Sequence, residues 1–263
     1  MNKSILFVSL WTTRKSTFFW SLGLFLIVVM VVALYDSMAK QYDKMLVDMP
    51  AGFEAIAGQI GSIGTPEGWL GVEVFGMVLP IALAIIGIGA GASAVGREES
   101  SGTLELLLAS PMSRGRILLE KACAIAIQLA LVSFATWLAV AFGVWFMSFE
   151  VSLTTVFYAT FSGWLLGVLF AFIALAVQTA TGSRGLALGI GAALLILGYF
   201  SHTLAPLVES IEVAKYFSPF YYYDARQILT DGLTVGHVAV LAASSAVALA
   251  VAYIFFQRRD VNV

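Results

Sequence analysis

The chain alternates long apolar runs with short polar segments, and six of the apolar runs are long enough to cross a membrane. They lie at about residues 17–35, 71–95, 118–147, 153–178, 185–204 and 233–256. About 20 apolar residues in a helix cross a hydrocarbon core, in which only helices and closed barrels satisfy the backbone. These runs are too long for barrel strands. The pattern therefore predicts an all-α polytopic membrane protein with six transmembrane helices.

The composition agrees with this prediction. Of 263 residues, 60% are hydrophobic and 11% are charged, whereas about a quarter of the residues of a soluble domain are charged. No internal repeat and no long polar segment divides the chain, so we expect one domain over residues 1–263. The net charge of −2 indicates no nucleic-acid partner. The expected surroundings are a lipid bilayer.

The basic residues predict the direction of the spans. Ten of the 14 Lys and Arg residues fall in segments on the same side as the N-terminus, and four fall on the other side. The ten are Lys3, Arg14, Lys15, Arg97, Arg114, Arg116, Lys121, Arg184, Arg258 and Arg259. Because short cytoplasmic segments are enriched in Lys and Arg, we expect both termini in the cytoplasm.

The segment before the first run has an amphipathic pattern. Ile5, Leu6, Val8 and Leu10 recur at helical spacing, and basic residues stand at both ends of the segment. This pattern is typical of a helix that lies in the inner membrane interface. An extended start of the first transmembrane helix explains it equally well, so both interpretations stay open.

A charged island at residues 96–121 separates the second and third runs. Residues 102–109 can form two helical turns with their leucines on one face. Pro111 stops this short helix, and Ser113 can cap the next one. By physical chemistry alone, the segment is equally well an ordinary loop whose leucines rest on the membrane surface.

The order of residues in the island closely resembles the corresponding loop of ABC-2 type transporter permeases. The matching positions are Glu98, Glu99, Gly102, Thr103, Leu104, Glu105, Leu106, Leu107, Leu108, Pro111, Ser113 and Arg114, followed by Leu119, Glu120 and Lys121. Further segments that look like this family lie at residues 65–70, 181–185, 218–221 and 258–260. Together they cover nearly the whole chain.

The resemblance implies a specific architecture and specific partners. It implies an N-terminal interfacial helix, six transmembrane helices, and short outer helices between the fifth and sixth. It also implies a cytoplasmic coupling helix that docks into an ATPase, made by Glu98, Glu99, Gly102, Thr103, Leu104, Glu105, Leu106, Leu107, Pro111, Ser113 and Arg114. The expected assembly holds two ABC ATPase subunits and a second permease copy or paralogue, in a bacterial or archaeal cell membrane.

The chain lacks the motifs of a nucleotide-binding enzyme. No G-x-x-x-x-G-K-[ST] sequence occurs, so no phosphate-binding loop is expected. We therefore expect a non-enzymatic subunit that binds no cofactor itself, with ATP and Mg on the partner ATPase. His202 and His237, with Cys123 inside an apolar run, do not form a metal-binding pattern.

A substrate path is only weakly marked in the sequence. No ionisable residue falls in the middle third of a predicted span, which disfavours an ion-coupled carrier. Gln128, Gln178 and Trp164 are the candidate lining residues, although packing explains each of them as well. The resemblance points to the fifth helix, at Gly185 and Gly189, as the seam with a second permease; small residues at this spacing permit close helix packing.

The sequence thus predicts the membrane permease subunit of an ATP-driven ABC exporter for a hydrophobic or amphipathic substrate. Two alternatives remain. The first is an ABC-linked membrane maturation or remodelling factor that releases no cargo. The second, less favoured, is an ion-coupled carrier.

Overall fold

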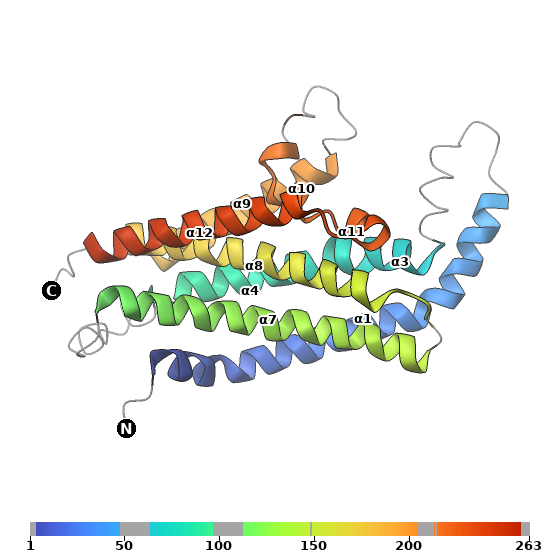
Figure 1. Ribbon diagram of the computed structural model, residues 1–263, viewed down its shortest axis with the longest axis horizontal. Helices are drawn as coiled ribbons and strands as arrows, with labels where there is room; N and C mark the ends of the chain where they lie inside the picture. The colour runs from blue at the N-terminus through green and yellow to red at the C-terminus, as the bar shows by residue number, and fades with distance from the viewer. Residues whose placement is uncertain are drawn as a thin grey trace.

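The structure is a computed structural model that describes residues 4–47, 64–96, 113–147, 149–204, 213 and 215–258 (Figure 1). Its elements are α1 (Ile5–Val47), α3 (Pro66–Glu73), the π-helix η1 (Val74–Val78), α4 (Leu79–Ser93), α7 (Arg114–Phe146), α8 (Leu153–Thr181), α9 (Arg184–Leu204), α10 (Pro219–Tyr223), α11 (Ala225–Asp231) and α12 (Val235–Arg258). No strand occurs in these ranges.

The six predicted spans are confirmed. α1, the continuous stretch from α3 to α4, α7, α8, α9 and α12 are each long and apolar enough to cross a membrane. The last four begin and end within a few residues of the predicted runs. The two short helices α10 and α11 lie between α9 and α12 in the chain, as expected. The protein is a multi-pass membrane protein.

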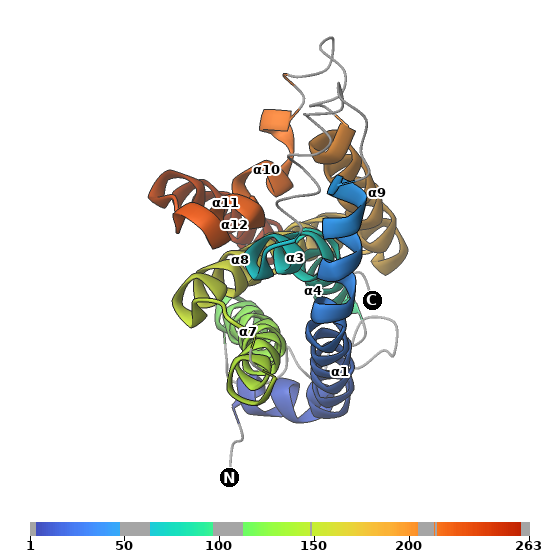
Figure 2. The same cartoon turned by 90° about the vertical axis from the view of Figure 1, so that its right-hand side faces the viewer.

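α8 is the central helix of the bundle. It packs against α4, α7, α9 and α12, and most of its residues are buried, whereas α9 and α12 remain largely exposed. Figure 2 shows α8 between α4, α7 and α12. Glycines allow the closest of these contacts: a Cβ on Gly87 would lie 2.4 Å from the carbonyl oxygen of Gly167, and one on Gly91 would lie 2.0 Å from that of Ala171. α4 and α8 therefore pack backbone to backbone.

α1 is one unbroken helix, so the interfacial helix inferred from the resemblance is not a separate element. Its first turns run at an angle to the rest of the helix (Figure 2). In the first part of α1, Thr12, Thr13 and Thr17 each donate a hydrogen bond to the carbonyl oxygen four residues earlier, at 2.8, 3.0 and 3.0 Å. Such bonds draw carbonyls outward and bend helices without interrupting them.

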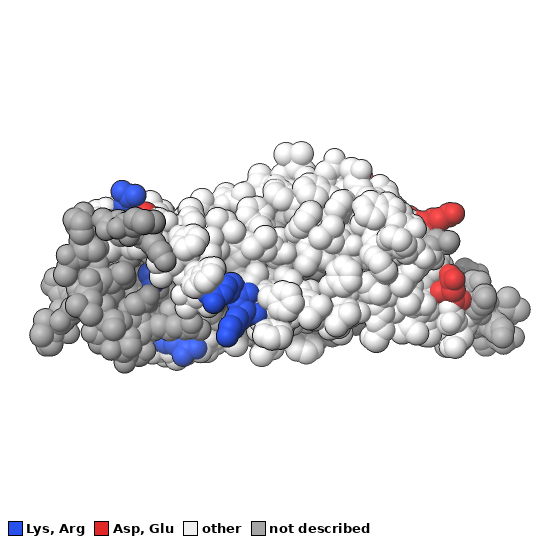
Figure 3. Space-filling model, turned by 90° about the horizontal axis from the view of Figure 1, so that it is seen from below, with Lys and Arg blue, Asp and Glu red and all other residues white. Residues whose placement is uncertain are grey.

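The charges divide the bundle into two ends. We call the end where α1 and α7 begin and α4, α8 and α12 finish the basic end. In Figure 3, Lys and Arg side chains gather toward that end and the clearest acidic side chains stand at the other. Among the described residues, the basic end carries Arg14, Lys15, Arg114, Arg116, Lys121, Arg184 and Arg258, with Glu120.

Candidate functional site

The loop predicted to couple the protein to an ATPase joins α4 to α7 at the basic end. Most of its candidate residues lie outside the described part of the chain: Glu98, Glu99, Gly102, Thr103, Leu104, Glu105, Leu106, Leu107 and Pro111. The coupling helix therefore stays a prediction. The structure does describe the two ends to which this loop is attached, and their contacts limit how the loop can act.

The exit of the loop is capped as predicted. Ser113 has an extended backbone conformation, φ −66° and ψ 145°, and its Oγ accepts a hydrogen bond from the backbone N–H of Arg116 at 3.4 Å. This is the N-cap arrangement, which satisfies one of the free N–H groups at a helix start. Arg114 is the first helical residue of α7. Gly115 packs against the ring of Tyr253 and so holds this helix start on α12.

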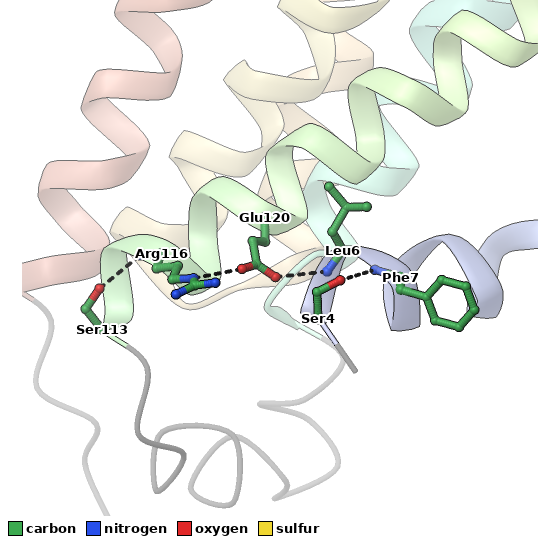
Figure 4. Close-up of polar contacts among 6 residues, drawn as sticks. All are labelled: Ser4, Leu6, Phe7, Ser113, Arg116 and Glu120. Atoms are coloured by element: carbon green, nitrogen blue, oxygen red, sulfur yellow. Dashed lines mark hydrogen bonds and ion pairs between the residues drawn. The ribbon is translucent and has the colours of Figure 1, made fainter. Parts of the chain in front are cut away.

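Glu120 joins the start of α1 to α7 (Figure 4). One carboxylate oxygen accepts the backbone N–H of Leu6 at 3.2 Å, and the other is 2.9 Å from Nε of Arg116, one turn earlier on α7. Ser4 Oγ accepts the neighbouring N–H of Phe7 at 3.3 Å. The N–H groups at a helix start carry partial positive charge, so a carboxylate is favourable there.

Lys121, the next residue, joins the end of α4 to α7. Its Nζ donates a hydrogen bond to the carbonyl oxygen of Ala94, and only 6% of the side chain is exposed. Ala94 is the C-cap of α4, where carbonyls lack helical partners and carry partial negative charge. Two consecutive residues of α7 thus hold two other helix ends in place: Glu120 holds the start of α1, and Lys121 holds the end of α4, where the loop begins.

A cavity of about 400 Å³ lies beside Lys121. The first turns of α1, the second half of α4, α7 and the start of α9 enclose it. Its lining includes the buried side chains of Ser93, Lys121 and Gln128, and the exposed side chain of Arg184. Buried ionisable groups in membrane proteins often belong to functional sites, so this polar and positively charged hollow is a candidate site.

The structure separates the three candidate residues of the substrate path. Gln128 lines the cavity. Trp164 instead donates its Nε1–H to the carbonyl oxygen of Ala126 at 2.8 Å and so joins α8 to α7. Gln178 is fully buried near the end of α8, beside Gly96. The cavity therefore contains one of the three.

The two predicted seam glycines face open space. Among the described residues, nothing lies within 4 Å of a Cβ built on Gly189, and only Ser183 lies within 4 Å of one built on Gly185. The opposite side of α9 is occupied, because a Cβ on Gly191 would lie 2.7 Å from Ile88. Whether a second permease covers Gly185 and Gly189 stays a prediction.

The sequence reasoning missed Lys121 as a buried contact with the end of α4. It was counted only as a cytoplasmic positive charge and as part of the family pattern. A signal was present: Ile117, Leu118 and Ile125 stand one turn before and after it, and all three are buried. A lysine on such an apolar stripe must reach a polar partner at a helix end.

Comparison with known proteins agrees with this architecture. Residues 10–261 match the family model described as ABC-2 family transporter protein. The match includes α1 from residue 10 onward, the other five transmembrane spans, and the loop between α4 and α7. No curated protein matches the chain.

Proposed function

The chain belongs to the ABC-2 family of transporter proteins, and we propose that it is the permease subunit of an ATP-driven exporter. The family match over residues 10–261 carries this proposal. In the proposed assembly two ABC ATPase subunits bind ATP and Mg, and a second permease copy or paralogue completes the pathway. The substrate is hydrophobic or amphipathic. Both termini lie in the cytoplasm of a bacterial or archaeal cell.

Movement of the ATPases enters the permease through the loop between α4 and α7. Gly102 to Ala109 is the coupling helix of this proposal, with Glu98, Glu99 and Arg114 at its flanks. A push on this loop acts on the end of α4 and on the start of α7. Lys121 binds the end of α4 to α7, and Glu120 binds the start of α1 to α7. The three helices therefore respond as one unit, which supports this route of coupling.

A charge reversal in the loop tests the proposal. Glu99→Lys with Glu105→Lys opposes the charge of a docking surface, and like charges at an interface cost several kcal/mol. We expect the variant to reach the membrane normally but to lose co-purification with the ATPase, or to lose substrate-stimulated ATP hydrolysis. The matched control is Glu150→Lys, an exposed acid at the other end of the bundle. Unchanged docking and transport in the double variant would remove the loop from the mechanism.

Transport itself requires a vesicle assay. The purified complex is reconstituted, ATP is supplied to the ATPase side, and the accumulation of amphipathic dyes or lipids on the other side is measured. ATP-dependent accumulation supports export. ATP hydrolysis without movement of any cargo favours a maturation or remodelling factor instead.

A further inference from the structure

The cavity beside Lys121 has a polar floor. Ser93 Oγ is buried and has no hydrogen-bond partner within the described part of the chain. Gln128 is 4% exposed and makes no hydrogen bond with the described residues. A buried polar group without a partner is unfavourable, so such groups imply a ligand or ordered water in the space they line.

The charge in the cavity is positive. Lys121 and Arg184 are the only charged side chains among the described residues that line it, and no acidic residue is among these lining residues. Glu120 neighbours Lys121 in sequence, but its carboxylate is held by Arg116 and Leu6 and does not belong to the lining. Two positive charges in a hollow of the bundle, where screening is weaker than in water, favour an anion.

The rim of the cavity is open to the outside of the bundle and combines the polar side chains of Thr12 and Ser16 with apolar side chains. Val8, Trp20 and Ile85 line it and are 48%, 38% and 47% exposed. Phe18 and Phe19 on the same helix α1 are 61% and 68% exposed. In a membrane these side chains face acyl chains rather than water. The occupant therefore needs an anionic head for the floor and an apolar tail for the rim.

We propose that this cavity binds the phosphate-bearing headgroup of an anionic lipid from the leaflet at the basic end. Lys121 and Arg184 provide the positive charge, and the Ser93 hydroxyl and the Gln128 amide donate hydrogen bonds to the phosphate oxygens. The acyl chains lie along α1 and α4 over Trp20 and Ile85. This site does not depend on transport, since it requires only the bilayer and this chain.

The position of the site gives the lipid a structural consequence. The headgroup sits between α1, α4 and α7, the three helices that Glu120 and Lys121 join. A bound lipid adds contacts that exist only in the folded protein. Binding of this kind raises apparent stability with ligand concentration.

Lipid titration of the full-length chain in detergent tests the proposal. Native mass spectrometry and thermal unfolding are followed with phosphatidylglycerol, phosphatidylcholine, glycerol phosphate and inorganic phosphate. We expect tight binding and a rise in Tm only with phosphatidylglycerol. Equal effects of both lipids would overturn the anionic headgroup. Equal effects of inorganic phosphate and phosphatidylglycerol would overturn the lipid and indicate a free-anion site.

Two variants identify the residues without risking the fold. Ser93→Ala removes the unpartnered hydroxyl, and Arg184→Gln removes a charge from an exposed side chain. Each should weaken phosphatidylglycerol binding about tenfold or more, since a hydrogen bond to a charged group contributes about 1.5–3 kcal/mol. Phosphatidylcholine binding should not change.

The chain provides a matched control for each variant. Ser162→Ala removes another buried hydroxyl without a partner in the described chain, and Arg258→Gln removes another exposed charge at the basic end. Neither residue lines the cavity. If the controls weaken phosphatidylglycerol binding as much as the test variants, general attraction to anionic lipid explains the result and the proposed site is wrong.

Discussion

The phenol of Tyr223 donates a hydrogen bond of 2.9 Å to the main-chain carbonyl oxygen of Phe75, 148 residues earlier in the chain. Both residues are buried. The bond fastens α10, which precedes α12, to the π-helix η1 in the second span. It thus joins a short connecting helix to the transmembrane bundle.

The local sequence explains why that carbonyl is available. In an α-helix the oxygen of Phe75 would accept the N–H of Leu79, but in η1 Leu79 donates to Val74 instead. The next residue is Pro80, which has no N–H to donate. A buried carbonyl without a partner is unfavourable, so the Tyr223 hydroxyl supplies the missing donor.

Removing this hydroxyl should destabilise the protein. Tyr223→Phe keeps the buried ring but leaves the Phe75 carbonyl without a partner, at a cost of about 1–3 kcal/mol. We expect a lower Tm in detergent by thermal unfolding. Tyr222→Phe is the matched control, since its hydroxyl bonds the carbonyl oxygen of Tyr216 at an exposed position. An equal Tm for Tyr223→Phe and wild type would mean that this bond adds no stability.

The same residue predicts a dependence on alkaline pH. Burial raises the pKa of Tyr223 well above its ordinary value of about 10. The neutral phenol is therefore favoured more in the folded protein than in the unfolded one. Its contribution to stability is complete below pH 10 and is lost as pH rises from about 10 toward the folded pKa. Tm should fall more steeply above pH 10 in wild type than in Tyr223→Phe.

Glycines four residues apart have different roles on α4 and on α9. Gly91→Ala places a Cβ against the Ala171 carbonyl between α4 and α8, and this backbone cannot yield without separating the helices. We expect a loss of about 1–3 kcal/mol or more, measured as a lower Tm and a lower yield of folded monomer.

Gly185→Leu with Gly189→Leu makes the contrasting case. A Cβ at either position meets no close contact within the described part of the chain, so monomer stability should stay within about 0.5 kcal/mol of wild type. Assembly with a second permease, measured by size-exclusion chromatography in detergent, should be lost. Normal assembly of this variant would move the seam away from this face of α9.

Local patterns predicted the fold well where they act within one helix. The apolar run at 153–178 predicted α8. Ser113 was predictable as the cap of α7, because a cap involves residues only three apart. The first helix was harder. Thr12, Lys15 and their neighbours are polar enough to end an apolar run, yet threonines can bond the preceding turn and continue a bent helix.

Contacts between distant segments were beyond the reach of the sequence. Lys121 binds Ala94 across 27 residues and Tyr223 binds Phe75 across 148. Both depend on which helix faces which, and apolar runs do not encode that choice. Gln128 shows the same limit. The sequence identified it as a polar residue at membrane depth but did not predict that it lines the same cavity as Ser93 and Lys121.

Hydrogen exchange tests the link between α1 and α7. Glu120→Ala removes the acceptor of the Leu6 N–H, so the first turn of α1 should fray and its backbone amides should exchange faster. The effect should stay within residues 5–8, because later amides have helical partners. Arg116→Ala is the control: it breaks the ion pair but leaves the Leu6 contact. Similar exchange in both variants would mean that the hydrogen bond between Glu120 and Leu6 does not by itself protect the first turn of α1.

The orientation of the bundle is tested with single cysteines at its two ends. Cys123 is the one cysteine of the sequence, so Cys123→Ala serves as the background. Arg258→Cys stands at the end of α12, and Glu150→Cys stands in the connection between α7 and α8; both positions are exposed. The excess of Lys and Arg at the basic end predicts that this end faces the cytoplasm. An impermeant maleimide should therefore label Glu150→Cys in intact cells and Arg258→Cys only after the cells are opened. The reverse pattern would place the α4 to α7 loop outside the cell, where no ATPase could reach it, and would overturn the proposed coupling together with the orientation.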